Sequence, residues 1–327
     1  MAELSYIQAI TAAMKEEMER DDNVFIVGED VGAKGGVFRA TDGLYQSFGE
    51  HRVIDAPLAE SAIVGVSIGS AMYGMRPIAE IQFADFIMPA VNQIVSEAAK
   101  IRYRSNNDWN CPITIRAPYG GGISGALYHS QSVEAMFNSH PGLKIVMPSS
   151  PYDAKGLLKA AIRDNDPVLF FEHKRAYRLL KEHVPEEDYV IPIGKADVKR
   201  EGTDVTVITY GTCVHFAKQA AKKLEKEGID VHILDLRTVY PLDQESIIEA
   251  ASKTGKVLLI TEDNKEGSII GEVAAIIAEH CLFELDAPIK RLAGPAVPAM
   301  PYAHPLENAF MVNEEKIEQA IRDLALF

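Results

Sequence analysis

The 327-residue sequence contains little cysteine, one tryptophan and no long apolar run. The three cysteines, Cys111, Cys213 and Cys281, form no C-x-x-C pair, which argues against a disulfide framework and a zinc ribbon and predicts a reducing, cytoplasmic location. No apolar stretch reaches the roughly 18 residues of a membrane span. The N-terminal segment mixes acids into its apolar pattern and shows no cleavage signature, so a signal peptide is not expected.

Positive charge is also scarce, with 33 Lys and Arg against 47 Asp and Glu and a net charge of −14. An acidic surface argues against nucleic acids and anionic membranes as partners, and suits basic partners or simple solubility. Apolar residues make up 47% and charged residues 24%, as in globular proteins. The length predicts roughly two domains of about 150 residues each.

Strands and helices alternate along the chain, and the strands are continuously apolar. This pattern predicts parallel sheets covered on both faces. Ser5, with Gln8 three residues on, has the form of a capping box that opens the first helix. A small-residue helix is expected over 60–73 and a long helix over 88–103.

The alternation of strands and helices is interrupted over residues 176–203, where Pro185, Pro192 and an acidic run from Glu186 to Asp188 indicate a linker. A second alternation of strands and helices follows. We therefore predict two parallel-sheet α/β domains, one over 1–185 and one over 186–327.

Two short motifs favour a structural interpretation over a functional one. Gly120, Gly122 and Gly125 match G-x-G-x-x-G, but the next strand, at 144–147, does not end in the acid that a dinucleotide ribose needs. The G-x-S-x-G match around Ser67 lies within a run of helical length. A nucleophile elbow instead needs a strand and a strained turn, so we interpret Ser67 as a helix-packing residue.

Three other groups of residues stand where parallel sheets bind ligands. Glu60 opens a helix after a strand, where it either stabilises the helix dipole or, if half-buried, exchanges a proton with a ligand. Gln82 and Phe86 follow another strand, and the aromatic ring either joins the core or stacks on a flat heterocycle. His129 lies in a polar loop after three glycines, which suits proton transfer.

Several long stretches carry a resemblance that covers essentially the whole chain. VGEDVG, PLAESAIVG, IAEIQFADF, GALYHSQS, PGLKIVMPS and LDLRTVYPLD resemble the beta subunit of the decarboxylating component of 2-oxo acid dehydrogenase complexes. GALYHSQS and RYRSN are more similar to the branched-chain members than to the pyruvate members. The resemblance implies a pyrimidine-binding thiamine-diphosphate domain over 1–185 and a transketolase C-terminal-type domain over 186–327.

The resemblance also implies roles for the residues above. Glu60 would hydrogen-bond the pyrimidine nitrogen N1′ and promote the imino tautomer that deprotonates the thiazolium carbon. Phe86 would stack on the pyrimidine, with Gln82 nearby. His129 would donate a proton or serve the lipoyl site in reductive acylation. A potassium loop is implied at the positions Ile113, Ala161, Ile162, Asp164 and Asp166, the last of which replaces a frequent asparagine.

One expected motif is missing from the sequence. The resemblance implies a G-D-G motif followed about 27 residues later by an asparagine pair, which together hold the diphosphate and magnesium. The only asparagine pair is Asn106-Asn107, and no G-D-G precedes it at that spacing. An alpha subunit is therefore expected to supply the diphosphate half and most of the magnesium site, within an α2β2 heterotetramer.

The remaining expectations concern substrate and partners. The resemblance implies oxidative decarboxylation of a branched-chain 2-oxo acid such as 2-oxoisovalerate, with acyl transfer to a lipoyl group. Pyruvate or acetoin versions of this chemistry, and a non-catalytic assembly subunit, are the alternatives. The subunit-binding and lipoyl domains of the acyltransferase core are expected partners, with Glu284 and Asp286 on a candidate docking face.

Overall fold

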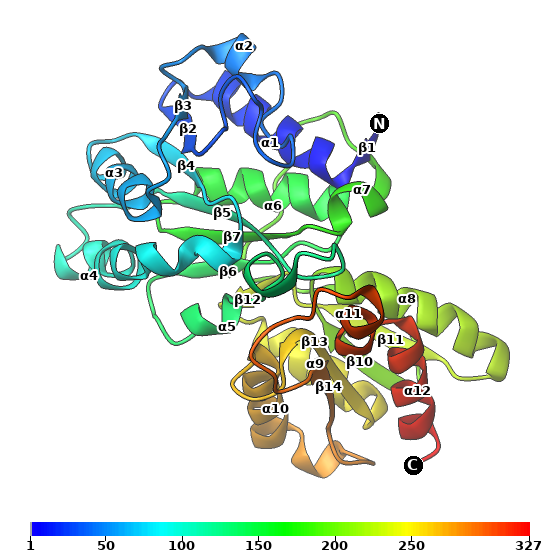
Figure 1. The fold of residues 1–327 in the computed structure, drawn as a ribbon. Helices are drawn as coiled ribbons and strands as arrows, with labels where there is room; N and C mark the ends of the chain where they lie inside the picture. The colour runs from blue at the N-terminus through cyan, green and yellow to red at the C-terminus, as the bar shows by residue number, and fades with distance from the viewer. Residues whose placement is uncertain (1) are drawn as a thin grey trace. The chain divides into compact units, whose positions relative to one another are not determined.

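The computed structural model describes residues 2–327 and divides them into two compact units. The first unit contains the chain up to Tyr119 together with Met136–Ile193, and the second contains Gly120–Ala135 together with Gly194–Phe327. Figure 1 shows helices around a sheet in each unit. The boundary predicted at residue 185 divides the chain once, whereas the compact units divide it at three points.

The first unit is built on a parallel sheet whose strands run in the order β6-β7-β5-β4-β2-β3. Every residue of the central strands is buried or nearly so, which explains their continuous apolar sequences. The strands are β2 (Val24–Gly28), β3 (Val53–Asp55), β4 (Arg76–Glu80), β5 (Thr114–Tyr119), β6 (Lys144–Val146) and β7 (Val168–His173).

Helices of the first unit pack against this sheet through apolar faces. α1 (Tyr6–Arg20) and α6 (Pro151–Arg163) lie side by side and share one core cluster with the sheet (Figure 1). Both halves of the predicted capping box at Ser5 and Gln8 are present at the start of α1. The other helices are α2 (Leu44–Phe48), α3 (Glu60–Met72), α4 (Ile101–Arg104) and α7 (Ala176–Leu179).

The long helix predicted over 88–103 is broken in the structure. It consists of the 3-10 turns η1 (Ala84–Ala90) and η3 (Ala98–Lys100), the π-turn η2 (Gln93–Glu97) between them, and α4. Pro89 lies inside the first turn, where it cannot donate a backbone hydrogen bond. The apolar spacing that predicts a helix is retained, but the hydrogen-bond pattern switches among the 3-10, α and π types along this segment.

The predicted linker over 176–203 contains regular structure. After α7, β8 (Lys181–Val184) pairs antiparallel with β1 (Ala2–Ser5), a short strand that precedes the first helix. A further strand, β9 (Asp197–Arg200), joins the sheet of the second unit. The pairing of β1 with β8 could not be predicted from local sequence, because most of the first unit separates the two strands in the chain.

The second unit has a smaller sheet in the order β14-β13-β10-β11-β9, in which only β9 is antiparallel to its neighbour. The strands of this sheet are β9, β10 (Val205–Thr209), β11 (Val231–Asp235), β13 (Val257–Asn264) and β14 (Lys290–Gly294). The short strand β12 (Thr238–Tyr240) lies outside this sheet. Its longer helices are α8 (Thr212–Leu224), α9 (Gln244–Thr254), α10 (Ile269–His280), α11 (His304–Phe310) and α12 (Glu314–Ala325). Short turns complete it, namely η4 (Ala126–Tyr128), η5 (Glu225–Glu227) and η6 (Leu282–Glu284), while α5 (Glu134–Phe137) spans the junction of the units.

Candidate functional site

The carboxyl ends of β2, β3 and β4 gather polar side chains at one edge of the first sheet. β3 lies on one side of β2 and β4 on the other, so the strand order reverses between β2 and β4. Open α/β sheets bind ligands at such a switch point. Asp30 follows β2 and Gln82 follows β4, and the Gln82 amide donates to Asp30 Oδ2 over 3.3 Å. Gln82 therefore lies where the sequence predicts a ligand contact.

Two carboxylates lie close together at this edge. Glu60 is the first residue of α3 and is buried, and Glu29, directly after β2, is buried as well. Burial raises the pKa of Glu29, and the negative charges of Glu60 and Asp30 raise it further. Glu29 Oε1 has no hydrogen-bond partner among residues 2–327. A buried acceptor without a partner is costly, so this pair fits a ligand that carries N–H groups or a protonatable ring nitrogen.

Sequence reasoning missed Glu29, although a signal was present. An acid that directly follows the buried strand VFIVG stands at the carboxyl end of a parallel strand, as Glu60 does after the next one. The pair of strand ends, rather than either acid alone, identifies the site.

Aromatic rings adjoin these polar groups in sequence and form a wall. Phe86, in η1, meets Phe83 edge-on with ring centroids 5.6 Å apart, and Phe83 meets Phe38 in the same way at 5.3 Å. Both Phe83 and Phe86 are half-buried. The Lys174 ammonium lies 5.6 Å from the centroid of the Phe83 ring and adds a cation–π contact. A half-buried apolar wall of edge-on aromatic rings suits contact with a heterocycle.

A buried ionic network beneath this edge was not predicted from the sequence. Arg116, in the middle of β5, donates through Nε and Nη2 to both oxygens of Glu172 over 2.6 and 2.7 Å, and through Nη1 to Glu80 over 2.7 Å. The Tyr177 hydroxyl donates to Glu172 over 2.7 Å. Burial raises the pKa of Glu80 although Arg116 opposes the rise. An arginine within an apolar strand requires buried acceptors, which is the signal that could have found the network.

His129 belongs to the second unit, where it follows η4. Its side chain is half-buried, and Leu127 and Tyr128 before it are exposed. The backbone of this loop is bound by two buried carboxylates of the second unit. Gly121 N–H donates to Glu262 over 2.6 Å, and Gly122 N–H to Glu307 over 2.9 Å. The structure thus groups His129 with the second unit, and Glu60, Gln82 and Phe86 with the first.

The five predicted potassium positions lie at the ends of β5, α6 and β7 in the first unit. The carbonyls of Ile162 and Asp164 each accept a hydrogen bond from Arg76, over 3.0 and 2.8 Å. The carboxylate of Asp164 is paired with Lys144 at 2.6 Å and that of Asp166 with Arg102 at 2.9 Å. The side-chain charges are therefore balanced by protein cations.

Backbone oxygens are the remaining donors at these positions. The carbonyl of Ile113 accepts from Val168 N–H, and that of Ala161 accepts from Asp164 N–H. Because each carbonyl oxygen has two lone pairs, these groups can also face an alkali cation. The donor set is compatible with a cation held by backbone oxygens rather than by carboxylates.

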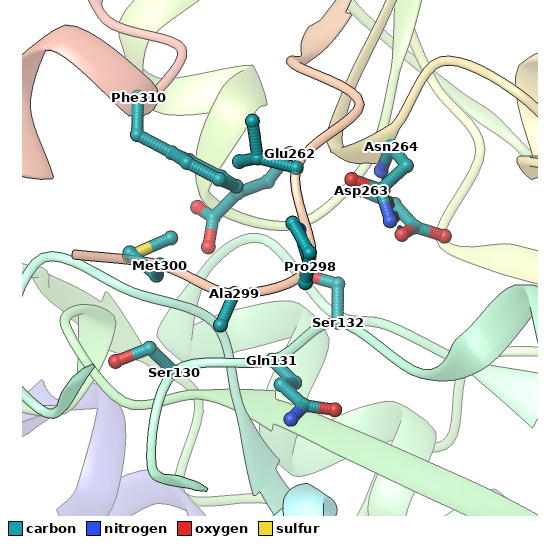
Figure 2. Close-up of a pocket in the computed structure, with 11 residues that line it drawn as sticks. Ser130, Gln131, Ser132, Glu262, Asp263, Asn264, Pro298, Ala299, Met300 and Phe310 are labelled. Atoms are coloured by element: carbon teal, nitrogen blue, oxygen red, sulfur yellow. Dashed lines mark hydrogen bonds between the residues drawn. The ribbon is translucent and has the colours of Figure 1, made fainter. Parts of the chain in front are cut away.

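A small cavity of about 80 Å³ lies within the second unit next to the His129 loop. Figure 2 shows Ser130, Gln131 and Ser132 of this loop at the cavity, together with residues that end β13. The remaining labelled lining residues are Glu262, Asp263, Asn264, Pro298, Ala299, Met300 and Phe310. Burial raises the pKa of Asp263. Sequence reasoning did not predict this cavity.

Residues 2–327 contain neither a cluster of metal-ligating side chains nor a membrane-spanning helix. Within this part of the chain, no group of three or more His, Cys, Asp or Glu side chains is placed to hold a metal ion. Across the same residues, no helix is both long and apolar enough to cross a membrane.

Comparisons with known proteins agree with this architecture. The family model described as "Transketolase, pyrimidine binding domain" matches residues 2–179, and "Transketolase, C-terminal domain" matches residues 194–317. The fold also resembles a solved structure titled "Split gene transketolase, inactive beta4 tetramer", with a TM-score of 0.81, 21% identity, and 99% and 98% of the two chains covered. The fold and the first-unit site thus define a two-domain protein of the transketolase type.

Relatives that match over the full length show which transketolase-type proteins this chain is similar to in sequence. The chain is 77% identical over 327 residues to the 2-oxoisovalerate dehydrogenase subunit beta of Bacillus subtilis (strain 168), covering 100% of both chains. It is 46% identical, again covering 100% of both, to the pyruvate dehydrogenase E1 component subunit beta of the same organism. The chain belongs to the family of transketolase-type beta subunits of 2-oxo acid dehydrogenases. The predicted resemblance and fold class are confirmed.

Proposed function

We propose that this chain is the beta subunit of a thiamine-diphosphate-dependent dehydrogenase for branched-chain 2-oxo acids, with 2-oxoisovalerate as its substrate. The observation that carries the proposal is the buried pair Glu29 and Glu60 at the switch point, with one Glu29 oxygen unpartnered. The 77% identity to a 2-oxoisovalerate dehydrogenase beta subunit supports this substrate over pyruvate, whose relative is 46% identical.

The residues at the first sheet edge fit the aminopyrimidine half of thiamine diphosphate. When bound, that cofactor supplies a carbon nucleophile for the 2-oxo carbonyl. Glu60 accepts a hydrogen bond from the protonated pyrimidine nitrogen, and its burial strengthens that bond by excluding water. Gln82 and Phe86 orient the ring through the amide and the half-buried aromatic face. His129 holds or donates a proton in the acyl-transfer half of the reaction.

An alpha subunit completes the site in this proposal. The helix α3 carries no charged side chain after Glu60, and its outer face leaves Val66 62% exposed. Leu58 before the helix and Tyr73 after it are 80% and 93% exposed. An apolar face of this kind, beside the candidate cofactor residues, supports a partner chain that buries it. The diphosphate and most of the magnesium site belong to that partner.

Two finer assignments are part of the proposal. The backbone oxygens at Ile113 and Ala161 hold a potassium ion that stabilises the β5–α6 region. The exposed residues Glu284 and Asp286 lie on a face that docks a basic region of the acyltransferase core. The fully exposed Phe283, directly before Glu284, supports this face as a contact surface.

The test is a reconstitution with the alpha subunit. Glu60→Gln keeps the size of the side chain and removes its charge, so we expect turnover of 2-oxoisovalerate to fall by about 10² to 10⁴, the range for a proton-handling group. Glu50→Gln, at an exposed acid of the same unit, is the matched control and should retain activity. Normal turnover by Glu60→Gln would instead favour a non-catalytic assembly subunit.

A further inference from the structure

The loop that carries His129 has a backbone that needs external support. Ser124 and Ala126 both have a φ of 55°, a backbone conformation that residues other than glycine rarely adopt. Around Gly125 the loop folds tightly, because an added Cβ would lie 2.7 Å from the carbonyl oxygen of His129. The conformation just before His129 is therefore strained, and persists only where contacts hold it.

Those contacts come from Glu307 in α11, a residue that no motif identifies. Its Oε1 accepts hydrogen bonds from the N–H groups of Gly122 and Ser124, both over 2.9 Å, and its Oε2 accepts from the Ser124 hydroxyl over 3.2 Å. The carboxylate is only 2% exposed. A buried carboxylate with three donors, two of them on the strained residue Ser124, is a strong anchor.

The flanks of the loop are anchored in the same unit. On one side, Gly121 N–H donates to Glu262, and an added Cβ at Gly121 would overlap the Met300 side chain. On the other side, Glu134 accepts from the Tyr210 hydroxyl over 2.8 Å. Tyr210 follows β10 and Glu262 lies near the end of β13.

These anchors stand at a second switch point. In the second sheet, β11 lies on one side of β10 and β13 on the other, so the strand order reverses between β10 and β13. Sheets of this type place ligands outside the carboxyl ends of such strands. Here the chain's own loop, residues 120–135, binds there through its backbone N–H groups.

We propose that Glu307 is a positioning residue, whose carboxylate holds the loop in the one conformation that presents His129 for acyl transfer. The inference rests on the proposed function for the role of His129. The clamp itself follows from the contacts of Glu307 and can be tested without turnover.

The first test is amide hydrogen exchange of the full chain assembled with its alpha subunit. Glu307→Gln keeps the side-chain size but loses the charged acceptor, so the amides of 121–125 should exchange about tenfold faster or more. Ser124→Ala removes one of the three bonds and should give a smaller rise. Glu315→Gln, at an exposed acid of α12, is the control and should match the wild type. Unchanged exchange in Glu307→Gln overturns the inference, whatever the activity.

The second test asks whether Glu307 acts through His129. Glu307→Gln and His129→Ala should each lower lipoyl acylation. The double variant should acylate lipoyl groups no more slowly than His129→Ala alone, because Glu307 acts on this step only by positioning His129. A double variant whose loss of rate equals the product of the two single losses would overturn the inference. A fully active His129→Ala would refute the proposed role of His129, while the exchange result would still decide the clamp.

Discussion

Removal of the Arg116 guanidinium should destabilise the first unit more than any surface change of the same size. Arg116→Met leaves Glu80 and Glu172 buried, near each other and without their cation. Three charge-assisted hydrogen bonds of 2.6 to 2.7 Å are lost. Breaking a buried pair by removing one partner costs about 3 to 5 kcal/mol, because a buried charge remains uncompensated.

The expected change can be measured as a melting temperature. In a unit of this size, 1 kcal/mol corresponds to about 2 to 4 °C, so the variant should melt roughly 10 °C lower or more. The single tryptophan, Trp109, lies in the first unit and reports its unfolding by fluorescence. Arg104→Met is the matched control, because Arg104 pairs with Glu97 at a half-exposed position. That surface pair is worth about 1 kcal/mol or less.

The pH dependence gives an independent check. The pKa of Glu80 is raised on folding, so folding is linked to proton uptake at this carboxyl and its contribution to stability falls as the pH rises toward the folded-state pKa. The positive charge of Arg116 opposes this rise, so its removal raises the pKa of Glu80 further. The deficit of Arg116→Met should therefore be larger at about pH 8 than at about pH 5. A deficit no greater than that of Arg104→Met, or one independent of pH, would refute the reasoning.

Three further changes have expected outcomes. Gly142→Ala should lower the melting temperature by several degrees, because Gly142 has a φ of 101° and the added Cβ would overlap the Ala99 carbonyl. Gly74→Ala is the control, because Gly74 has a similar φ of 99° but open space around it, so this variant measures the backbone strain alone. Phe86→Ala should raise the thiamine diphosphate concentration for half-activation of the assembled complex about tenfold, while Phe283→Ala should not. Replacing potassium chloride with choline chloride should lower the melting temperature of the chain, whereas equal melting in both salts would contradict the proposed cation.

Local features of the fold were predictable from the sequence. The capping box at Ser5 and Gln8 was correct because both partners lie within one turn of the helix. Ser67 was correctly interpreted as a packing residue, since it is buried in α3 and its hydroxyl donates to the Ile63 carbonyl over 2.7 Å. The parallel sheets followed from continuous apolar strands.

Features that depend on distant partners were not predictable. The bonds of Arg116 require β4, β5 and β7 to be neighbours in a specific register, which no local pattern specifies. Likewise, the loop before His129 is held by Glu307, which lies 183 residues beyond Ser124. The broken helix after β4 kept the apolar spacing of a helix, so the pattern could not reveal the π-turn.

Three residues of the candidate site could be singled out from the sequence. Glu60, Gln82 and Phe86 follow strands whose carboxyl ends share one sheet edge, whereas their roles toward a cofactor stay predictions. Glu29 was missed because its importance lies in its proximity to Glu60 and in its unpartnered oxygen. Both properties arise only once β2 and β3 are paired.

The most direct test of the account is the kcat/KM of the chain assembled with its alpha subunit, measured for 2-oxoisovalerate and for pyruvate with thiamine diphosphate present. We predict activity only in the assembled pair, with 2-oxoisovalerate preferred by at least about tenfold. Equal or greater activity with pyruvate would contradict the substrate assignment. Activity of this chain alone would contradict the proposal that it holds only the pyrimidine half of the site.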